Sequence, residues 1–246
     1  MDLDKTDKAT LIGLYIAKFD KQALETLGFT RFSQAWNAIG YSLGTKPFSI
    51  RNYRDEFDRF FPDNPRKGWQ RELKSRSERL FNKFDSLDFD AFTDLIKSFL
   101  IQNYEEEKAV SSIIKPDNSE SVAKRLITGK AAEEYFKATY QLISDFKNYE
   151  LRDTTNLACG FDFKLSHGTD FYCVEVKGLN HNSGSIVMTE KEYEVANNLQ
   201  DRYCLFLVKN FIVKPVHQYI FNPLDSDLIF KKIERTVVQI HYSTSF

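Results

Sequence analysis

The 246-residue sequence has few of the residues that mark special classes of protein. It contains 3 cysteines, 10 glycines and 6 prolines, against 22 phenylalanines and 12 tyrosines. This composition excludes collagen-like, linker-dominated and disordered chains. Apolar runs fall short of the ~20 residues that a membrane-spanning helix needs, and the first residues, MDLDKTDK, alternate in charge where a secretory signal would be apolar. We therefore expect a cytoplasmic protein with no membrane partner.

The cysteines and histidines are not placed as ligands of the common zinc sites. Cys159, Cys173 and Cys204 are scattered over apolar segments and form no C-x-x-C pair, which excludes a disulfide framework and a structural zinc site. None of the four histidines lies four residues from another, which argues against histidine-built zinc sites and HNH-type nuclease centres. A single loop histidine stays open as a functional residue.

The net charge of -1 conceals an uneven distribution along the chain. Residues 46–83 carry eleven basic and six acidic side chains, whereas residues 84–120 carry three basic and nine acidic ones. Nucleic-acid binders can be neutral overall and still concentrate positive charge in one region. The basic block at 46–83 is therefore where contacts with a nucleic acid are expected.

The spacing of apolar residues also changes along the chain. Helical spacing runs through residues 9–105, whereas strand-like runs begin only after about residue 157. The acidic, turn-forming stretch at 103–118 is the best boundary candidate. We predict a helical domain over residues 1–112 and a second domain over residues 119–246.

Two helices of the first domain resemble the outline of a helix-turn-helix DNA reader. A helix around Trp36 is followed by a glycine-containing connection and then by a second helix, for which Ser49 can serve as N-cap. Ile50, Tyr53 and Phe57 would lie on the buried stripe of that second helix. The residues predicted to point outward, toward DNA, are Arg51, Asn52 and Arg54.

The basic stretch after this helix is suited to phosphate contacts, because it is rich in turns and contains Trp69. Its predicted DNA-binding residues are Arg66, Lys67 and Arg71. Two alternatives stay open. The helix can instead present a solvated face on which its arginines pair with Asp55, Glu56 and Asp58, and Trp69 can be a core anchor.

The second domain is predicted to open with a helix at 119–147, in which Gly129 suggests close packing. A β-hairpin follows, and further elements are expected near the C-terminus. The predicted strands are Leu157–Leu165, Phe171–Gly178, Phe211–Phe221 and Thr236–Tyr242, with a tight turn at Ser166–Asp170 and a short helix at Asp225–Glu234.

Three ionisable side chains can converge on one face of this hairpin. Asp162 alternates with two phenylalanines, and Glu175 and Lys177, two residues apart, must point to the same face. Burying two carboxylates and a lysine is unfavourable unless they pair or bind a cation. The carboxylates suit Mg²⁺, and a lysine beside it can activate water and stabilise charge on a phosphate. The alternative is a surface pair between Glu175 and Lys177 on an open hairpin face.

This arrangement resembles the PD-(D/E)XK nuclease core, and more narrowly the Protein NO VEIN C-terminal type of domain of restriction-system proteins. The resemblance covers about residues 125–211 and rests on five motifs. They are GKAAE at 129–133, GFD at 160–162, VEVKG at 174–178, TEKE at 189–192 and YCLFLV at 203–208. It implies an α+β fold, with an all-α N-terminal domain followed by an αβββαβ nuclease core around a mixed sheet.

The resemblance also implies roles for single residues. Asp162 and Glu175 would bind Mg²⁺, Lys177 would be the catalytic lysine, and Glu133 on the preceding helix would complete the catalytic and metal site. A solvent-facing Glu133 is the alternative. Asp162 follows Phe161 where the name of the motif has a proline.

Residues around this core are predicted to support it. Thr189 and Glu192 have the spacing of a capping box, a structural role that we favour over a catalytic one. In the polar loop after the second hairpin strand, His181 and Asn182 would contact DNA, or else belong to a solvated connector.

The sequence therefore predicts a Mg²⁺-dependent DNA endonuclease of the restriction type, which hydrolyses phosphodiester bonds at specific sites in double-stranded DNA. A homodimer would match two-fold DNA sites. One alternative is a catalytically inactive DNA-binding module of a defence or chromatin assembly. Another is an unrelated scaffold in which the E-V-K motif is accidental.

Overall fold

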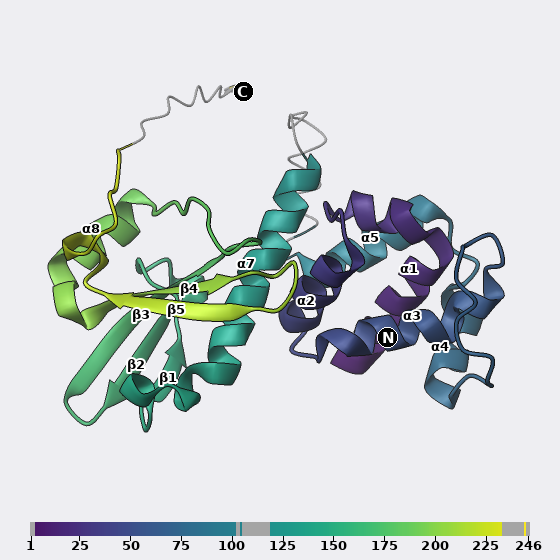
Figure 1. The fold of residues 1–246 in the computed structure, drawn as a ribbon, viewed down its shortest axis with the longest axis horizontal. Helices are drawn as coiled ribbons and strands as arrows, with labels where there is room; N and C mark the ends of the chain where they lie inside the picture. The colour runs from purple at the N-terminus through teal and green to yellow at the C-terminus, as the bar shows by residue number, and fades with distance from the viewer. Residues whose placement is uncertain (1–2, 102–103, 105–118, 233–243, 245–246) are drawn as a thin grey trace.

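The computed structural model describes residues 3–101, 104, 119–232 and 244. It consists of a helical half and a sheet half, with one long helix between them (Figure 1). None of the helices in these ranges is long and apolar enough to cross a membrane. Apart from residue 104, the predicted boundary at 103–118 lies outside the described residues, as does the strand predicted at 236–242.

The helical half buries the apolar faces that the spacing predicts. Leu14, Ile39 and Phe92 come from three different helices and share one hydrophobic cluster. Burial of such stripes, more than helix propensity, stabilises helices of this length. The elements are α1 (Lys5–Thr26), α2 (Phe32–Ser42), α3 (Pro47–Phe57), a 3₁₀ turn (Asp58–Phe60), α4 (Ser75–Phe84) and α5 (Phe89–Leu100).

Helix α3 begins three residues earlier than predicted. Pro47 occupies its first turn and Lys46 stands at the N-cap, so the assignment of Ser49 as N-cap is wrong. Proline is favoured at this position because its fixed φ suits a helix and the N–H that it lacks would have no intrahelical partner. The predicted buried stripe is confirmed at Ile50 and Phe57.

The sheet half is built on a mixed sheet, which confirms the predicted α+β class. Strand order is β1-β2-β3-β4-β5, with β3 and β4 parallel and the other pairs antiparallel. The elements are α7 (Ser119–Thr139), β1 (Glu150–Asp153), β2 (Phe163–His167), β3 (Asp170–Gly178), α8 (Glu190–Leu199), β4 (Tyr203–Lys209) and β5 (Val216–Phe221), with 3₁₀ turns at Tyr140–Leu142, Ser144–Phe146, Thr155–Leu157, Gln200–Arg202 and Pro223–Asp225.

Several predicted boundaries in this half are wrong. The first hairpin strand starts at Phe163, because Ala158 (φ 47°) and Gly160 (φ 93°) adopt left-handed conformations that a strand does not allow. The expected αβββαβ order includes a strand at the place of β1, but its segment, Glu150–Asp153, was not assigned from the sequence pattern, and β5 starts at Val216. Within the described residues, no helix follows Asp225.

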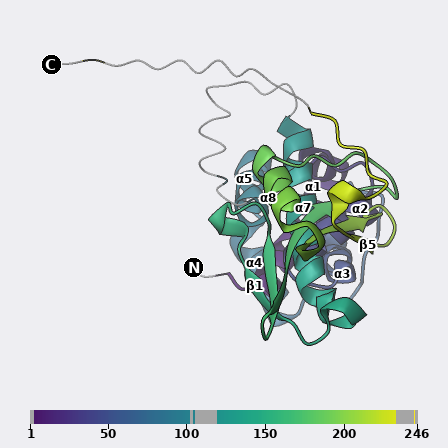
Figure 2. The same cartoon turned by 90° about the vertical axis from the view of Figure 1, so that its left-hand side faces the viewer.

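The sheet is covered on both faces (Figures 1 and 2). Helix α7 packs on the face that carries Val174 and Phe206, whereas α8 packs with Cys173 and Tyr203, which belong to the other face. Strand β3 therefore has an apolar face under α7. The opposite face of β3 lies under α8 and carries the residues in between, among them Cys173.

Helix α7 belongs to both halves. Ala123 and Ile127 lie in the cluster of the helical half, and Ala131 and Phe136 lie in the cluster under the sheet. The expectation of close packing at Gly129 is wrong, because an added Cβ would meet nothing within 4 Å. The division into two domains stays a prediction.

Candidate active site

Asp162 is held in place by hydrogen bonds to the backbone of β3 and to Thr154. Its Oδ2 accepts a hydrogen bond from Val176 N (2.9 Å), and Asp162 N donates to Val174 O (3.0 Å). The hydroxyl of Thr154 donates to Asp162 O at 2.9 Å. Asp162 thus lies against β3 although it is not part of a strand.

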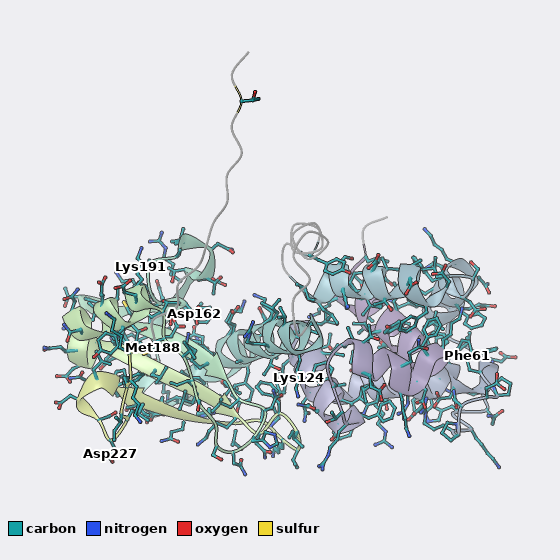
Figure 3. All side chains as sticks on the ribbon, turned by 90° about the horizontal axis from the view of Figure 1, so that it is seen from above. Phe61, Lys124, Asp162, Met188, Lys191 and Asp227 are labelled. Carbon is teal, nitrogen blue, oxygen red and sulfur yellow. The ribbon has the colours of Figure 1, made fainter. Side chains whose placement is uncertain are left out.

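Gly160 permits this course of the chain. A Cβ at Gly160 would lie 2.8 Å from Val195 Cγ2 on α8, and its φ of 93° is unfavourable for other residues. The Gly160 carbonyl accepts a hydrogen bond from the buried Tyr203 hydroxyl at 3.1 Å. In Figure 3, Asp162 lies with Lys191 of α8 in the sheet half, far from Phe61 in the helical half.

Glu175 and Lys177 point to the α8 face of β3, as their spacing predicts. Glu175 is only 3% exposed. The Lys177 ammonium is 2.6 Å from Glu175 Oε1 and 2.9 Å from Glu192 Oε2. The surface-pair alternative for Glu175 and Lys177 is therefore wrong, because Glu175 is buried, the Lys177 side chain is 21% exposed, and the lysine also pairs with Glu192.

The carboxylates of this cluster repel one another in a site that is largely buried. Burial raises the pKa of Asp162 to about 6, with the charge of Glu133 adding to the effect against the hydrogen bond from Val176. Burial and then repulsion by Asp162 raise the pKa of Glu175 further, although Lys177 opposes this. Burial alone would lower the pKa of Lys177, but the carboxylates of Glu175 and Glu192 more than compensate and raise it. The lysine is the counter-charge of the cluster.

Asp162 and Glu175 suit a hard divalent cation in chemistry and charge. Both present carboxylate oxygens, and their raised pKa values show that the ionised forms are unfavourable without a positive charge, which a cation would supply. Mg²⁺ keeps several of its waters and is often bound by one or two carboxylates. The described residues hold no group of three or more His, Cys, Asp and Glu side chains placed to bind a metal. A cation here would therefore rest on the pair and on water.

Glu133, the predicted third ligand, is not grouped with the pair. Its Oε2 accepts a hydrogen bond from Lys130 Nζ at 3.1 Å, on the same helix. Its charge nevertheless contributes to the raised pKa of Asp162. Its role as a catalytic or metal-binding residue stays a prediction.

Glu192 belongs to the site, and sequence reasoning did not place it there. The predicted capping box is confirmed, since Glu192 N donates to Thr189 Oγ1 (3.2 Å) and Thr189 N donates to Glu192 Oε2 (2.9 Å). The same Oε2 also accepts from Lys177. The TEKE motif at 189–192 is one of the five motifs of the resemblance. Its presence there was the one signal in the sequence that Glu192 belongs to the site.

The predicted base-reading residues of α3 divide into two groups. Arg51 and Asn52 are exposed, as predicted, with Arg51 Nε 3.6 Å from Asp55 Oδ2. Arg54 does not point outward. It is 8% exposed, and its guanidinium pairs with Asp55 and Asp58 and lies 5.1 Å from the centre of the Trp36 ring. The aromatic ring from α2 and these carboxylates bury Arg54 in the fold.

The predicted phosphate-binding residues divide in the same way. Arg66 binds Asp58 (Nε to Oδ2, 2.9 Å) and Asp20, so its guanidinium is engaged within the fold. Lys67 and Arg71 are exposed, and the Arg71 guanidinium lies 4.0 Å from the centre of the Trp69 ring. Trp69 is half-buried.

The loop after β3 presents its two predicted DNA-binding residues to solvent. His181 and Asn182 are exposed, while the His181 carbonyl accepts from Asn210 N at 3.1 Å. The preceding residue, Asn180, accepts from Gln34 Nε2 on α2 at 2.8 Å. This loop therefore links the candidate site to the helical half.

Residues 130–220 match the family described as Protein NO VEIN, C-terminal. That family is nuclease-like, and the match is confined to this segment. The matched segment contains Glu133, Asp162, Glu175, Lys177 and Glu192 and excludes α1 to α5. Comparison with curated proteins and with solved structures gave no match.

Proposed function

We propose that this chain is a Mg²⁺-dependent DNA endonuclease of the PD-(D/E)XK, restriction-enzyme type, which cuts phosphodiester bonds at specific sites in double-stranded DNA. The observation that carries the proposal is the buried cluster of Asp162, Glu175 and Lys177 on one face of β3. It lies in the segment that matches a nuclease-like family. The order α7, β1, β2, β3, α8, β4 agrees with the expected αβββαβ core.

The residues of the cluster have distinct tasks in this proposal. Asp162 and Glu175 would hold Mg²⁺, which supplies Lewis-acid stabilisation of charge on the phosphate. Lys177 would hold its ammonium toward the phosphate oxygens and orient the attacking water. Burial makes these charges more effective than they would be in water.

The helical half would supply DNA recognition. Arg51 and Asn52 are exposed on α3 and suit base contacts, whereas Lys67 and Arg71 suit phosphates. Arg54 and Arg66 are left out of this interface because their guanidinium groups are engaged by aspartates of the fold.

One observation favours a second candidate, a catalytically inactive nuclease-fold module that binds DNA. Lys177 already pairs with both Glu175 and Glu192, so the cluster is partly neutralised without a cation. A module of this kind would bind DNA and never cut it.

Plasmid cleavage separates the two candidates. Unmodified and methylated plasmid DNA is incubated with the protein in Mg²⁺, in Ca²⁺ and in EDTA. The nuclease proposal predicts discrete fragments in Mg²⁺ only, and binding without cleavage in Ca²⁺. Binding with intact DNA in all three conditions would favour the inactive module, and no binding at all would contradict both candidates.

A further inference from the structure

The Lys177 ammonium lies between carboxylates from two different elements. Glu175 Oε1 on β3 is 2.6 Å from Nζ, and Glu192 Oε2 on α8 is 2.9 Å from it. Glu175 belongs to the pair that is proposed to hold the cation, whereas Glu192 does not. The two partners of the lysine therefore differ in what happens to them when a cation binds.

Glu192 is fixed by its place at the start of α8. Its Oε2 accepts from the Thr189 backbone N–H (2.9 Å), and its own N–H donates to Thr189 Oγ1 (3.2 Å). Helix α8 is anchored on the sheet by the buried Ala196. A carboxylate held in a capping box has already lost much of its rotamer freedom, so ordering the lysine beside it costs little more.

We propose that Glu192 is a positioning residue that keeps the Lys177 ammonium in the site when a divalent cation takes up the charge of Glu175. The inference rests on the proposed nuclease function and assigns a task to a residue outside the expected cation ligands. The lysine has a flexible four-carbon stem, and a bound dication would repel its ammonium. Because Glu192 is not a ligand of the cation, the charge of its carboxylate still attracts the ammonium of Lys177.

Two substitutions separate this task from the capping role. Glu192→Gln leaves an amide oxygen that can accept from the Thr189 N–H, and glutamine is accepted at this position of a capping box, but the charge facing Lys177 is lost. Thr189→Ala removes the other bond of the box and keeps that charge. A merely structural Glu192 would make Thr189→Ala at least as harmful as Glu192→Gln.

The first readout is the split between kcat and KM for DNA cleavage in Mg²⁺. Loss of a group that orients a reactive residue typically costs about 10–100-fold, so we expect kcat of Glu192→Gln to fall by that factor with KM nearly unchanged. Thr189→Ala should retain a wild-type kcat while melting at a lower temperature. Equal losses of kcat in the two variants, or a wild-type kcat in Glu192→Gln, would overturn the proposal.

The second readout needs neither metal nor DNA. Urea unfolding in EDTA is measured for the wild type, Lys177→Met, Glu192→Gln and the double variant, and groups in contact give non-additive changes in unfolding free energy. We expect coupling in this cycle and additivity in the control cycle of Glu192→Gln with Lys137→Met, since Lys137 pairs elsewhere, with Glu134 and Asp153. Additivity between Lys177 and Glu192 would overturn the inference. If the wild type failed to cut DNA, the proposed function would fail, whereas this cycle would still decide whether Glu192 holds Lys177.

Discussion

Two ionised carboxylates buried beside each other destabilise the folded state unless a positive charge lies near them. Glu175 and Glu192 pair with the single ammonium of Lys177, whose charge also acts on Asp162, so the fully ionised cluster keeps an excess of negative charge. In a medium of low effective dielectric constant, this excess is unfavourable for folding and favourable for binding a cation. We therefore expect the charge of the cluster to lower the stability of the metal-free protein and to favour binding of a cation.

Asp162→Asn should stabilise the metal-free protein at pH 8. Burial raises the pKa of Asp162 from 3.8 to about 6, so the folded state holds a proton more tightly than the unfolded state. That contribution to stability is complete below about pH 4 and is lost as the pH rises through about 6. Asparagine keeps an acceptor for Val176 N without the charge, and we expect a gain of about 1–3 kcal/mol at pH 8 that vanishes near pH 4.

Urea unfolding in EDTA at the two pH values measures this difference. The matched control is Asp153→Asn. Although burial opposes the effect, hydrogen bonds from Thr155 and the charge of Lys137 lower the pKa of Asp153, so its ionised form is favoured by folding. Asp153→Asn should therefore lose stability at pH 8. An Asp162→Asn effect that is the same at both pH values would contradict the raised pKa.

At the scale of elements, β3 and α8 bring the site together. Strand β3 supplies Glu175 and Lys177, and α8 supplies Glu192 from above the same face. Gly160 lets the chain before β2 pass close under α8, so that Asp162 meets β3. The position of α8 over the sheet is thus as important as the strand.

Two glycine substitutions test how much backbone freedom this arrangement needs. Gly160→Ala would place a Cβ 2.8 Å from Val195 Cγ2 at a φ of 93°, and strain of this kind costs about 1–3 kcal/mol. Gly129→Ala meets nothing within 4 Å inside α7 and should stabilise the protein by about 0.5–1 kcal/mol. Thermal unfolding of both variants checks the opposite signs. A Gly160→Ala variant as stable as the wild type would show that α8 is free to move.

Substitutions on the exposed face of α3 should change the sequence preference of DNA binding and leave the stability of the protein unchanged. Asn52→Ala is expected to relax preference at one base pair by about 1–3 kcal/mol, whereas Lys67→Ala should weaken all sequences and shallow the slope of log affinity against log salt by about 0.9. Arg54→Ala should instead lower the melting temperature, because Arg54 is buried against Asp58. Gel-shift titrations at several salt concentrations measure these effects. Unchanged binding by Asn52→Ala and Lys67→Ala would indicate another task for the helical half.

Features with a local cause could be predicted from the sequence. The shared face of Glu175 and Lys177 follows from the period of a strand, and the capping box follows from a spacing of three residues. The burial of Arg54 depends on Trp36 from another helix, and the bond from Lys177 to Glu192 depends on where the crossover between β3 and β4 places α8. Such contacts join residues whose neighbourhood only tertiary packing creates.

At the scale of the whole molecule, α2 joins the helical half to the loops of the candidate site. Asn37 Nδ2 donates to Phe211 O (2.7 Å) and Val213 O (3.0 Å), and Gln34 Nε2 donates to Asn180 Oδ1 (2.8 Å). Gln34 and Asn37 are both buried. The proposed DNA-reading helix α3 packs on α2, so DNA contacts and the cluster are joined through a polar junction.

Asn37→Ala should weaken this junction. The buried carbonyl of Phe211 and the partly buried carbonyl of Val213 would lose their donor. An unsatisfied buried group costs about 1–3 kcal/mol, and cleavage should lose sequence specificity more than DNA affinity. Urea unfolding and a comparison of cleavage at specific and random sites measure the two effects. Ser42→Ala, which removes a hydroxyl that bonds within α2, is the control. A variant with wild-type stability would contradict the importance of the junction.

The most direct test of the central claim is DNA cleavage by Glu175→Gln, which keeps the shape of the buried side chain and removes its charge. Single-turnover rates in saturating Mg²⁺ are compared with those of the wild type, with binding measured in parallel in Ca²⁺. Asp153→Asn, which changes a carboxylate of β1 outside the cluster, is the control. The account predicts that Glu175→Gln binds DNA, stays folded and does not cut it, while Asp153→Asn cuts as the wild type does. Cleavage by Glu175→Gln at the wild-type rate would show that the buried cluster is not the catalytic site.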